Sequence, residues 1–413
     1  MYNFLFILFL AQTTWAFDFS YKLGYEGYFL FVSAQHPDTG INLGNEILKT
    51  PDYQLISEQR LDFKFNINDA KIILRPFWNY NRQKIKTNIT QQNYTNEKNK
   101  VDFYDLFFEQ IVNSKLSFTL GLQTYQWGPA ELINPSNPFY HFQSQQGTFG
   151  FKSKGTSIAR FNLDLTSGFN YVVMYEPVSN QEANWIYNQD FKPQHAMKIE
   201  KQFDNTRNML GLVWSHSDSN RESIGEYAQY EFYDGYTIYI DGVQNKNVDY
   251  YRPEYVNGFY KMSFQREQNW SSLLTVGARF ESDFDLRLEY IYNSLGFDQD
   301  EFAKVVTAIQ QTSVFLSENL KAFQNNGLEL LTQHYAYLSL RKSDFLSFKE
   351  FNLYLRTFNS LTDHSAVDQI EIDKGAGDYL VAYAQISAYR GSSDTEFKLS
   401  DNYKGTVGFK LAY

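Results

Sequence analysis

The chain has 413 residues, of which 18% are aromatic, and it contains no cysteine. A formal net charge of −10 at pH 7 argues against a nucleic-acid partner, and no segment after the N-terminus approaches the run of about 20 apolar residues that a membrane-spanning helix needs. Composition therefore excludes a helical membrane protein. It does not exclude a β-barrel, because the alternation of polar and apolar side chains gives a barrel the mean hydropathy of a soluble protein.

The first sixteen residues have the pattern of a secretory signal peptide. An unbroken apolar run extends from Phe4 to Leu10, and Thr14 and Ala16 place small residues at positions −3 and −1 of a cleavage site. No lysine or arginine precedes the run, so a buried strand or helix of a cytosolic protein is the alternative interpretation. We expect export by the general secretory route, with residues 1–16 removed and the mature chain, 17–413, forming one domain.

Segments in which apolar and polar side chains alternate recur along the mature chain, as in strands with one apolar face. The clearest hairpin turns at Ser282-Asp283. The polar segment 81–100 is expected to be a loop, and the register within 227–240 stays open. The expected strands are 21–31, 61–67, 71–80, 101–112, 116–122, 159–165, 171–175, 195–203, 210–214, 227–240, 255–265, 274–281, 286–292, 335–341, 351–357, 367–372, 380–389 and 403–413.

The final strand, 403–413, alternates apolar and polar residues and ends on Tyr413. About 9–11 residues suffice for a tilted strand to cross a membrane. A closing strand with a terminal aromatic residue resembles that of bacterial outer-membrane β-barrels of Gram-negative cells. The resemblance implies that outer-membrane lipid surrounds the barrel and that the barrel-assembly machinery recognises this strand. We expect the strand to pair with 21–31.

Period two alone does not separate a membrane barrel from a soluble sandwich, because both architectures give each strand one polar and one apolar face. The connections separate them, since short and long links take turns along the chain, as in barrels with tight periplasmic turns and long external loops. Because short and long connections alternate, the number of strands is even. Counting the expected strands gives 16 to 18, with 18 preferred. The sequence predicts an all-β fold, a transmembrane antiparallel β-barrel.

One segment departs from the β pattern. Between Gly296 and Gly327, apolar residues recur at helical spacing, with Asp298 near the start and Lys321 near the end. We expect a helix over about 298–325 in an external loop. It either packs into the barrel mouth or leans on neighbouring loops, and capping the rim and gating the channel are both open as its role.

The segment 123–139 leaves a strand and opens the third external loop. Its prolines and Gly128 impose a path that is neither helix nor sheet. Trp127-Gly128 followed by Asn134-Pro135 resembles a motif of porin-like outer-membrane families, and in classical porins the third loop folds inward and narrows the channel. The resemblance implies a constriction, and the alternative is a rigid loop sealed against the wall by Trp127 and Phe139. The residues expected at the constriction are Trp127, Glu131, Asn134, Asn137 and His141.

Charged residues of both signs fall on the polar faces of the expected strands. Pairs that stiffen the wall are a more economical interpretation than a ladder for one solute, and no strong ion selectivity follows. The residues expected to face the lumen are Arg160, Arg279, Glu281, Arg287, Glu289, Arg356, Lys404 and Lys410.

An enzymatic function has one candidate motif. The segment around His216 superficially resembles the His and Ser region of outer-membrane phospholipases, but Arg221 stands where those enzymes have glycine and the spacing differs. His and carboxylate residues show no metal-ligand spacing. We therefore expect no catalytic, metal or cofactor site.

The prediction from sequence is a porin-like outer-membrane channel for passive diffusion of small hydrophilic solutes. A barrel of 16–18 strands is wide enough for an aqueous lumen. The alternative is a non-conducting surface-binding or envelope-scaffold barrel whose lumen is filled by the third loop and the helix. Solute identity and oligomeric state are not determined by the sequence.

Overall fold

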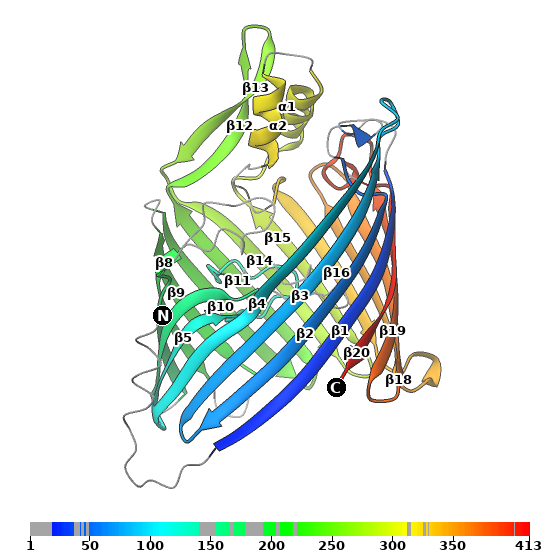
Figure 1. Ribbon diagram of the computed structural model, residues 1–413. Coiled ribbons are helices and arrows are strands. Elements are labelled where there is room, and N and C mark those ends of the chain that lie inside the picture. The colour runs from blue at the N-terminus through cyan, green and yellow to red at the C-terminus, as the bar shows by residue number, and fades with distance from the viewer. Residues whose placement is uncertain are drawn as a thin grey trace, which may run out of the picture.

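The computed structural model describes residues 19–413 except 37–41, 43–44, 47–48, 140–153, 166–167, 178–192, 204–206, 218–220, 312–314, 325–327, 329 and 400. Within this part of the chain, eighteen strands form one closed antiparallel sheet (Figure 1). The barrel strands are β1 (Phe19–Gln35), β2 (Tyr53–Ile67), β3 (Ala70–Lys86), β4 (Asn93–Asn113), β5 (Leu116–Gln123), β6 (Thr156–Asp164), β7 (Phe169–Tyr175), β8 (Pro193–Gln202), β9 (Met209–Ser217), β10 (Glu222–Tyr233), β11 (Tyr236–Lys246), β14 (Ser271–Glu281), β15 (Asp285–Asn293), β16 (His334–Lys342), β17 (Phe351–Ser360), β18 (Ala366–Ala376), β19 (Leu380–Arg390) and β20 (Tyr403–Ala412).

Each barrel strand pairs with the barrel strands before and after it in the chain, and β20 pairs with β1 from Glu26↔Ala412 to Gln35↔Tyr403. Closing the sheet on itself removes the unpaired edges that an open sheet would expose. The predicted fold class, the preferred number of 18 strands and the pairing of the last strand with the first are confirmed.

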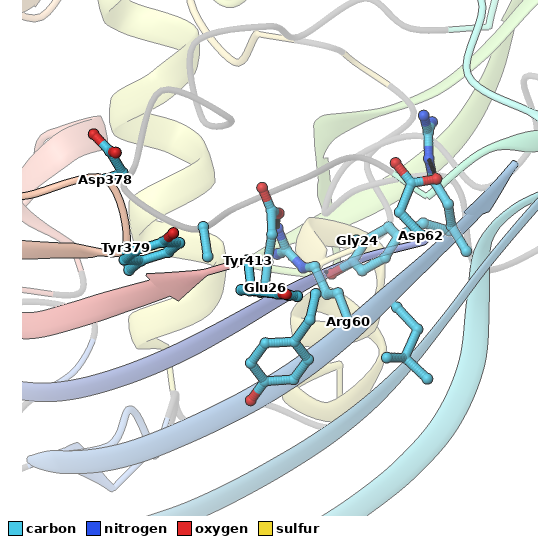
Figure 2. Close-up of a pocket in the computed structure, with 12 residues that line it drawn as sticks. Gly24, Glu26, Arg60, Asp62, Asp378, Tyr379 and Tyr413 are labelled. Atoms are coloured by element: carbon cyan, nitrogen blue, oxygen red, sulfur yellow. Dashed lines mark hydrogen bonds and ion pairs between the residues drawn. The ribbon is translucent and has the colours of Figure 1, made fainter. Parts of the chain in front are cut away.

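The closing seam holds a cavity of about 290 Å³ at the end of β20 (Figure 2). Tyr413 forms two backbone hydrogen bonds with Tyr25, at 2.8 and 2.9 Å, beyond the end of the strand. Glu26 of β1 and Arg60 of β2 line this cavity, and Lys410 of β20 forms an ion pair with Glu26 at 3.1 Å. The chain therefore ends against the first strand through both backbone and charged contacts.

Along most of the barrel wall, outward-facing side chains are apolar and exposed, whereas their inward-facing neighbours are buried. On β9, Leu212 is 51% exposed and the adjacent Val213 is 2% exposed. On β19, Ile386 is 63% exposed, and the adjacent Gln385 is buried. A soluble protein would bury the first set, so the exposed apolar faces define the outer surface of the barrel. None of the described helices is long and apolar enough to cross a membrane.

Two expectations about the strands were wrong. Segment 81–100 is a loop only at 87–92, because β3 and β4 continue as a polar hairpin beyond the point where their apolar residues stop. Segment 227–240 is not one strand but parts of β10 and β11, which turn at Asp234-Gly235, where Gly235 has φ of +83°. The first prediction was wrong because a polar composition was taken to indicate a loop. The second was wrong because the turn at Asp234-Gly235 was not recognised.

The expected strand 255–265 is also not part of the barrel. It belongs to the two-stranded sheet β12 (Val248–Val256) and β13 (Phe259–Glu267), which stands beyond the barrel at the long-loop end (Figure 1). Apolar and polar residues alternate in this sheet as well, because one of its faces is covered and the other is not. The covered face packs against other parts of the protein instead of lipid. The helix expected over 298–325 is two helices among the described residues, α1 (Gln299–Gln310) and α2 (Leu316–Gln324).

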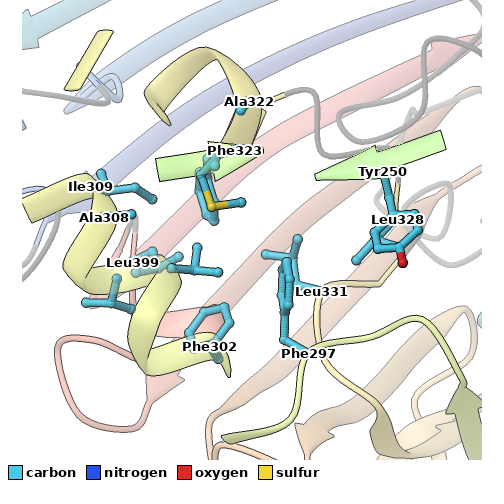
Figure 3. Close-up of a cluster of buried hydrophobic side chains, with 13 residues drawn as sticks. Tyr250, Phe297, Phe302, Ala308, Ile309, Ala322, Phe323, Leu328, Leu331 and Leu399 are labelled. Carbon is cyan, nitrogen blue, oxygen red and sulfur yellow. The ribbon is translucent and has the colours of Figure 1, made fainter. Parts of the chain in front are cut away.

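The β12–β13 sheet and the two helices form a packed unit, which we call the external unit (Figure 3). Asp298 caps α1 through a capping box with Glu301, so the predicted acidic start is the N-terminus of the helix. Phe302 and Ile309 of α1 pack with Met262 of β13, and each is at most 3% exposed. The helices therefore lean on a neighbouring loop element, one of the two placements that the sequence left open.

Candidate channel constriction

The β5–β6 loop, described over 124–139 and 154–155, folds into the barrel. Its Trp127 and Phe139 pack in one cluster with Met174, Ala196 and Val213, which lie on the inner faces of β7, β8 and β9. The rings of Trp127 and Phe139 meet edge to face, with centroids 6.1 Å apart. Burial of two aromatic side chains against the wall fixes the path of the loop across the lumen.

The first turn of this loop depends on Gly128 and Asn134. Gly128 has φ of +97°, and a Cβ at this position would collide with the side chains of Asn134 and Asp241. The amide side chain of Asn134 accepts from the backbone N–H of Ala130 and donates to its carbonyl, both at 2.9 Å. This pair of hydrogen bonds closes the loop on itself.

Asn134 and Asn137 are fully buried in the structure. The side chain of Asn137 accepts from the backbone N–H of Phe139 at 3.0 Å and donates to the carbonyl of Tyr125 at 3.5 Å. Both amides thus bind backbone groups of the loop. His141, the last residue expected at the constriction, lies outside the described residues.

Two carboxylates on the inner wall of the barrel accept hydrogen bonds from the loop. Glu289 of β15 accepts the backbone N–H groups of Glu131 and Leu132, at 2.5 and 3.0 Å, and the hydroxyl of Tyr239 at 2.8 Å. Glu289 is fully buried, so these three donors compensate for the water that its carboxylate gives up. Charge-assisted hydrogen bonds of this kind are stronger than neutral ones.

The second carboxylate is Asp241 of β11, which is also fully buried. It accepts from Ser136 twice, from the backbone N–H at 2.7 Å and from the hydroxyl at 3.1 Å. On β10, Gly225 leaves room for this contact, since a Cβ there would lie 2.8 Å from the Cα of Ser136. The loop is thus bound to β11 and β15, on a different part of the wall from the strands that its aromatic residues contact.

The side chain of Glu131 lies between the loop and the wall at β15 and β16. Its carboxylate accepts from Tyr337 at 3.1 Å and Ser339 at 2.7 Å, and it forms an ion pair with Arg287 at 3.3 Å. A cavity of about 110 Å³ adjoins this group, lined by Glu131, Asp285, Arg287, Ser339, Leu340, Arg341, Tyr354 and Arg356. Among the five residues expected at the constriction, Glu131 has the charged side chain at this cavity.

Most of the charged residues that we expected to face the lumen occur in ion pairs. Arg287 and Arg279 both bind Asp285, at 3.2 and 2.8 Å. Arg356 binds Glu371 of β18 at 2.7 Å. Glu281 binds Arg207 at 2.6 Å near the short-turn end, and Lys410 binds Glu26 as described above.

Arg160 and Lys404 are placed differently. The guanidinium of Arg160 lies 4.2 Å from the ring centroid of Tyr125, the second residue of the β5–β6 loop, and donates to Thr119 at 3.1 Å. This cation–π contact joins β6 to the loop. Lys404 pairs in register with Ala34 of β1 and is partly exposed.

A further charged group on the inner wall was not singled out from the sequence. Arg60 of β2 lies between the rings of Tyr28 and Tyr104, at 4.2 and 4.8 Å from their centroids, and binds Glu58 at 2.5 Å. These residues come from β1, β2 and β4, and their meeting depends on strand register. Glu58 and Arg60 precede the expected strand 61–67. The observed strand β2 begins earlier, at Tyr53, so the sequence pattern did not place these two residues on the wall.

Among its described residues, the motif around His216 does not bring a serine side chain to the histidine, and residues 218–220 of the motif lie outside the described part of the chain. His216 faces the same side of β9 as Trp214, and their rings lie 6.4 Å apart in a stacked arrangement. Ser215 and Ser217 alternate with it and are buried on the opposite face. A nucleophile and its base must lie within hydrogen-bond reach, and the strand separates these side chains.

The fold and the inward loop define a class, a closed barrel of eighteen strands in the described residues with a loop bound across its lumen. Solved structures of outer-membrane proteins share this fold. OccK1 (OpdK) from Pseudomonas aeruginosa matches with a TM-score of 0.55 and 9% identity, over 95% of this chain and 98% of that chain. OccAB1 from Acinetobacter baumannii matches with a TM-score of 0.54 and 9% identity, over 96% of each chain.

OccK2 (OpdF) from Pseudomonas aeruginosa, solved in complex with glucuronate, matches with a TM-score of 0.52 and 9% identity, over 95% of this chain and 98% of that chain. At this identity the likeness establishes the fold. No protein-family model matches the sequence, and no curated protein matches it.

Proposed function

We propose that the chain is a porin-like channel of a Gram-negative outer membrane through which small hydrophilic solutes diffuse passively. The observation that carries the proposal is the β5–β6 loop, which Glu289 and Asp241 bind across the lumen of a barrel wide enough for an aqueous path. A barrel of eighteen strands does not need such a loop for closure, so a narrowed passage is the simplest use for it.

Glu131 is the group that we assign to the channel side of the constriction. It is partly exposed and adjoins the 110 Å³ cavity, while Trp127, Asn134 and Asn137 hold the loop in place. His141 stays a proposed constriction residue. The eight charged residues expected at the lumen would give the wall a polar surface of both signs and a weak charge bias.

The remaining parts of the proposal concern export and assembly. Residues 1–16 act as a signal peptide, the general secretory route exports the chain, and the barrel-assembly machinery inserts it through the strand that ends on Tyr413. Outer-membrane lipid covers the outer face of the barrel. The exposed apolar side chains on that face support this part of the proposal. The proposed activity is transport without catalysis.

Solute flux into liposomes tests the proposal. The full-length protein is reconstituted, and swelling rates are measured for neutral sugars of increasing size and for glucuronate and vanillate, which occur in solved structures of proteins with this fold. We expect small solutes to enter and the rate to fall steeply with size. A folded barrel that admits none of them would contradict the proposal and support the non-conducting scaffold.

A further inference from the structure

The outward face of the β3–β4 hairpin carries three cationic side chains near the long-loop end. Arg82, Lys84 and Lys86 occupy alternate positions of β3, and all three are exposed. Arg82 forms an ion pair with Glu97 of β4 at 3.2 Å, and both side chains are more than half exposed. The described hairpin therefore presents an excess of positive charge outward, which we call the basic strip (Arg82, Lys84 and Lys86).

Strand register establishes that the basic strip points away from the lumen. Trp78 is on the same face of β3, is 40% exposed and lies opposite Val101, which is 75% exposed. Between them in sequence, Asn79 donates to Glu58 on the inner wall at 2.8 Å. Even-numbered residues from Trp78 onward thus face outward, and odd-numbered residues face inward.

The strip begins where the apolar band of β3 ends. From Ala70 to Tyr80, ten steps of about 3.3 Å along a strand tilted by about 40° give a height of about 25 Å, the height of the outer apolar band of membrane barrels. Arg82 is the next outward residue, and Lys84 and Lys86 follow at about 5 Å intervals of height. Their side chains therefore lie at the level of the lipid headgroups.

The neighbouring side chains are typical of that level. Tyr53 of β2 lies opposite Lys84, is 41% exposed, and has its ring centroid 5.8 Å from the ammonium nitrogen of Lys86. Tyrosine and tryptophan are enriched at membrane interfaces, because one end of the side chain is apolar and the other is polar. Lysine and arginine next to them attract anionic headgroups.

We propose that the basic strip binds the phosphate groups of lipid in the outer leaflet. This inference rests on the proposed location in an outer membrane but is independent of solute transport. Three cations over a rise of about 10 Å match a headgroup that carries more than one phosphate. The ion pair between Arg82 and Glu97 offsets part of the charge, so Lys84 and Lys86 supply most of the attraction.

The same hairpin offers a matched control. Lys98 and Lys100 of β4 alternate with Glu97 and so face the inner side, where Lys100 binds Asp102 at 3.2 Å. Replacing these two lysines removes the same charge from the same hairpin without touching its outer face. A nonspecific effect of net charge would appear in both double variants.

Native mass spectrometry of the full-length protein in a neutral detergent tests the inference. The probes are a bisphosphorylated glycolipid, its dephosphorylated form and inorganic phosphate. We expect Lys84→Gln/Lys86→Gln to weaken binding of the phosphorylated lipid about tenfold or more, and Lys98→Gln/Lys100→Gln to change it by less than about twofold. Binding of the dephosphorylated form should be weak in all three proteins, and inorganic phosphate should not displace the lipid.

Equal binding by wild type and Lys84→Gln/Lys86→Gln would overturn the inference, as would an equal loss in both double variants. Displacement by inorganic phosphate would assign the strip to the free ion and also contradict it. The heat-dependent shift in gel mobility verifies that each variant is a folded barrel. Liposome flux on the same preparations separates the two proposals, because a barrel that binds the lipid and passes no solute refutes only the channel.

Discussion

At the scale of single residues, buried acidic groups hold the loops of the protein in place. Asp241 and Glu289 do this inside the barrel, and Glu396 does it among the external loops. The carboxylate of Glu396 accepts from Tyr335 at 2.7 Å and Thr332 at 3.1 Å, and its backbone N–H donates to Asp363 at 2.6 Å. These contacts join the three consecutive loops at the mouth that follow β15, β17 and β19.

Burial raises the pKa of Glu396 from 4.5 to about 8, and the neighbouring Asp363 adds to the shift. A carboxyl group with a raised pKa is protonated in the closed loops and ionises more readily when they open. Its contribution to closure is therefore complete below pH 4.5 and is lost as the pH rises through about 8.

We predict that hydrogen exchange at Leu331 and Thr332, corrected for intrinsic rates, is faster at pH 9 than at pH 6. Glu396→Gln should flatten this dependence because glutamine does not titrate. Asp394→Asn is the control, since Asp394 is an exposed residue of the same loop. An unchanged pH profile in Glu396→Gln would show that another group controls the opening.

A second prediction at this scale concerns Asp241. Asp241→Ala leaves the backbone N–H and hydroxyl of Ser136 without their acceptor, a loss of about 1–3 kcal/mol for a buried group. We expect the β5–β6 loop to loosen and single-channel current to become noisier. Asp234→Asn, at the short turn of the same hairpin, should leave the current unchanged; similar noise in both variants would argue against the clamp.

At the scale of elements, the β5–β6 loop keeps its path because a glycine occupies a position that rejects any side chain. Gly128→Ala combines a φ of +97° with a collision against Asn134 and Asp241. We predict that this variant displaces the loop and alters the conductance step. Gly258→Ala is the matched control, because Gly258 has φ of +87° with no atom within 4 Å of an added Cβ.

The Gly258→Ala variant carries comparable backbone strain outside the barrel, in the turn between β12 and β13. Conductance should therefore separate the two variants although both are strained. If Gly128→Ala conducts like wild type while remaining folded, the loop does not set the width of the path.

Local alternation predicted most strands because each needs only its own side chains. The hairpin at Ser282-Asp283 is an example, with β14 and β15 paired from Glu281↔Asp285. Prediction failed where the alternating pattern could not show whether lipid or protein covers the apolar face of a strand. Residues of β12 and β13 alternate like those of barrel strands, but these strands pack against helices. Prediction also failed at the polar ends of β3 and β4, where hydrogen bonding continues after apolar residues stop.

The candidate site was predictable only in part. Proline, glycine and tryptophan spacing marked the loop, and Glu131 and Glu289 were both singled out. Their relation was not, because the contact joins residues 158 positions apart and depends on the register of distant strands. For the same reason the sequence did not identify Asp241 as the second acceptor.

At the scale of the whole molecule, the exposed outer face and the polar inner face fit a barrel that separates lipid from an aqueous path. The external unit stands beyond the mouth (Figure 1), and its own core, with Phe302 and Val305 at most 2% exposed, makes it independent of lipid. Most of the charged residues expected on the inner wall form ion pairs with other wall residues, so we expect the β5–β6 loop, rather than the wall, to set the width of the channel.

Single-channel conductance in a planar bilayer tests the central claim most directly. We predict discrete current steps for the full-length protein in its folded, heat-modifiable form, with weak preference between cations and anions because most of the charged residues expected at the lumen form ion pairs. A folded barrel that inserts into the bilayer and stays electrically silent would contradict the account.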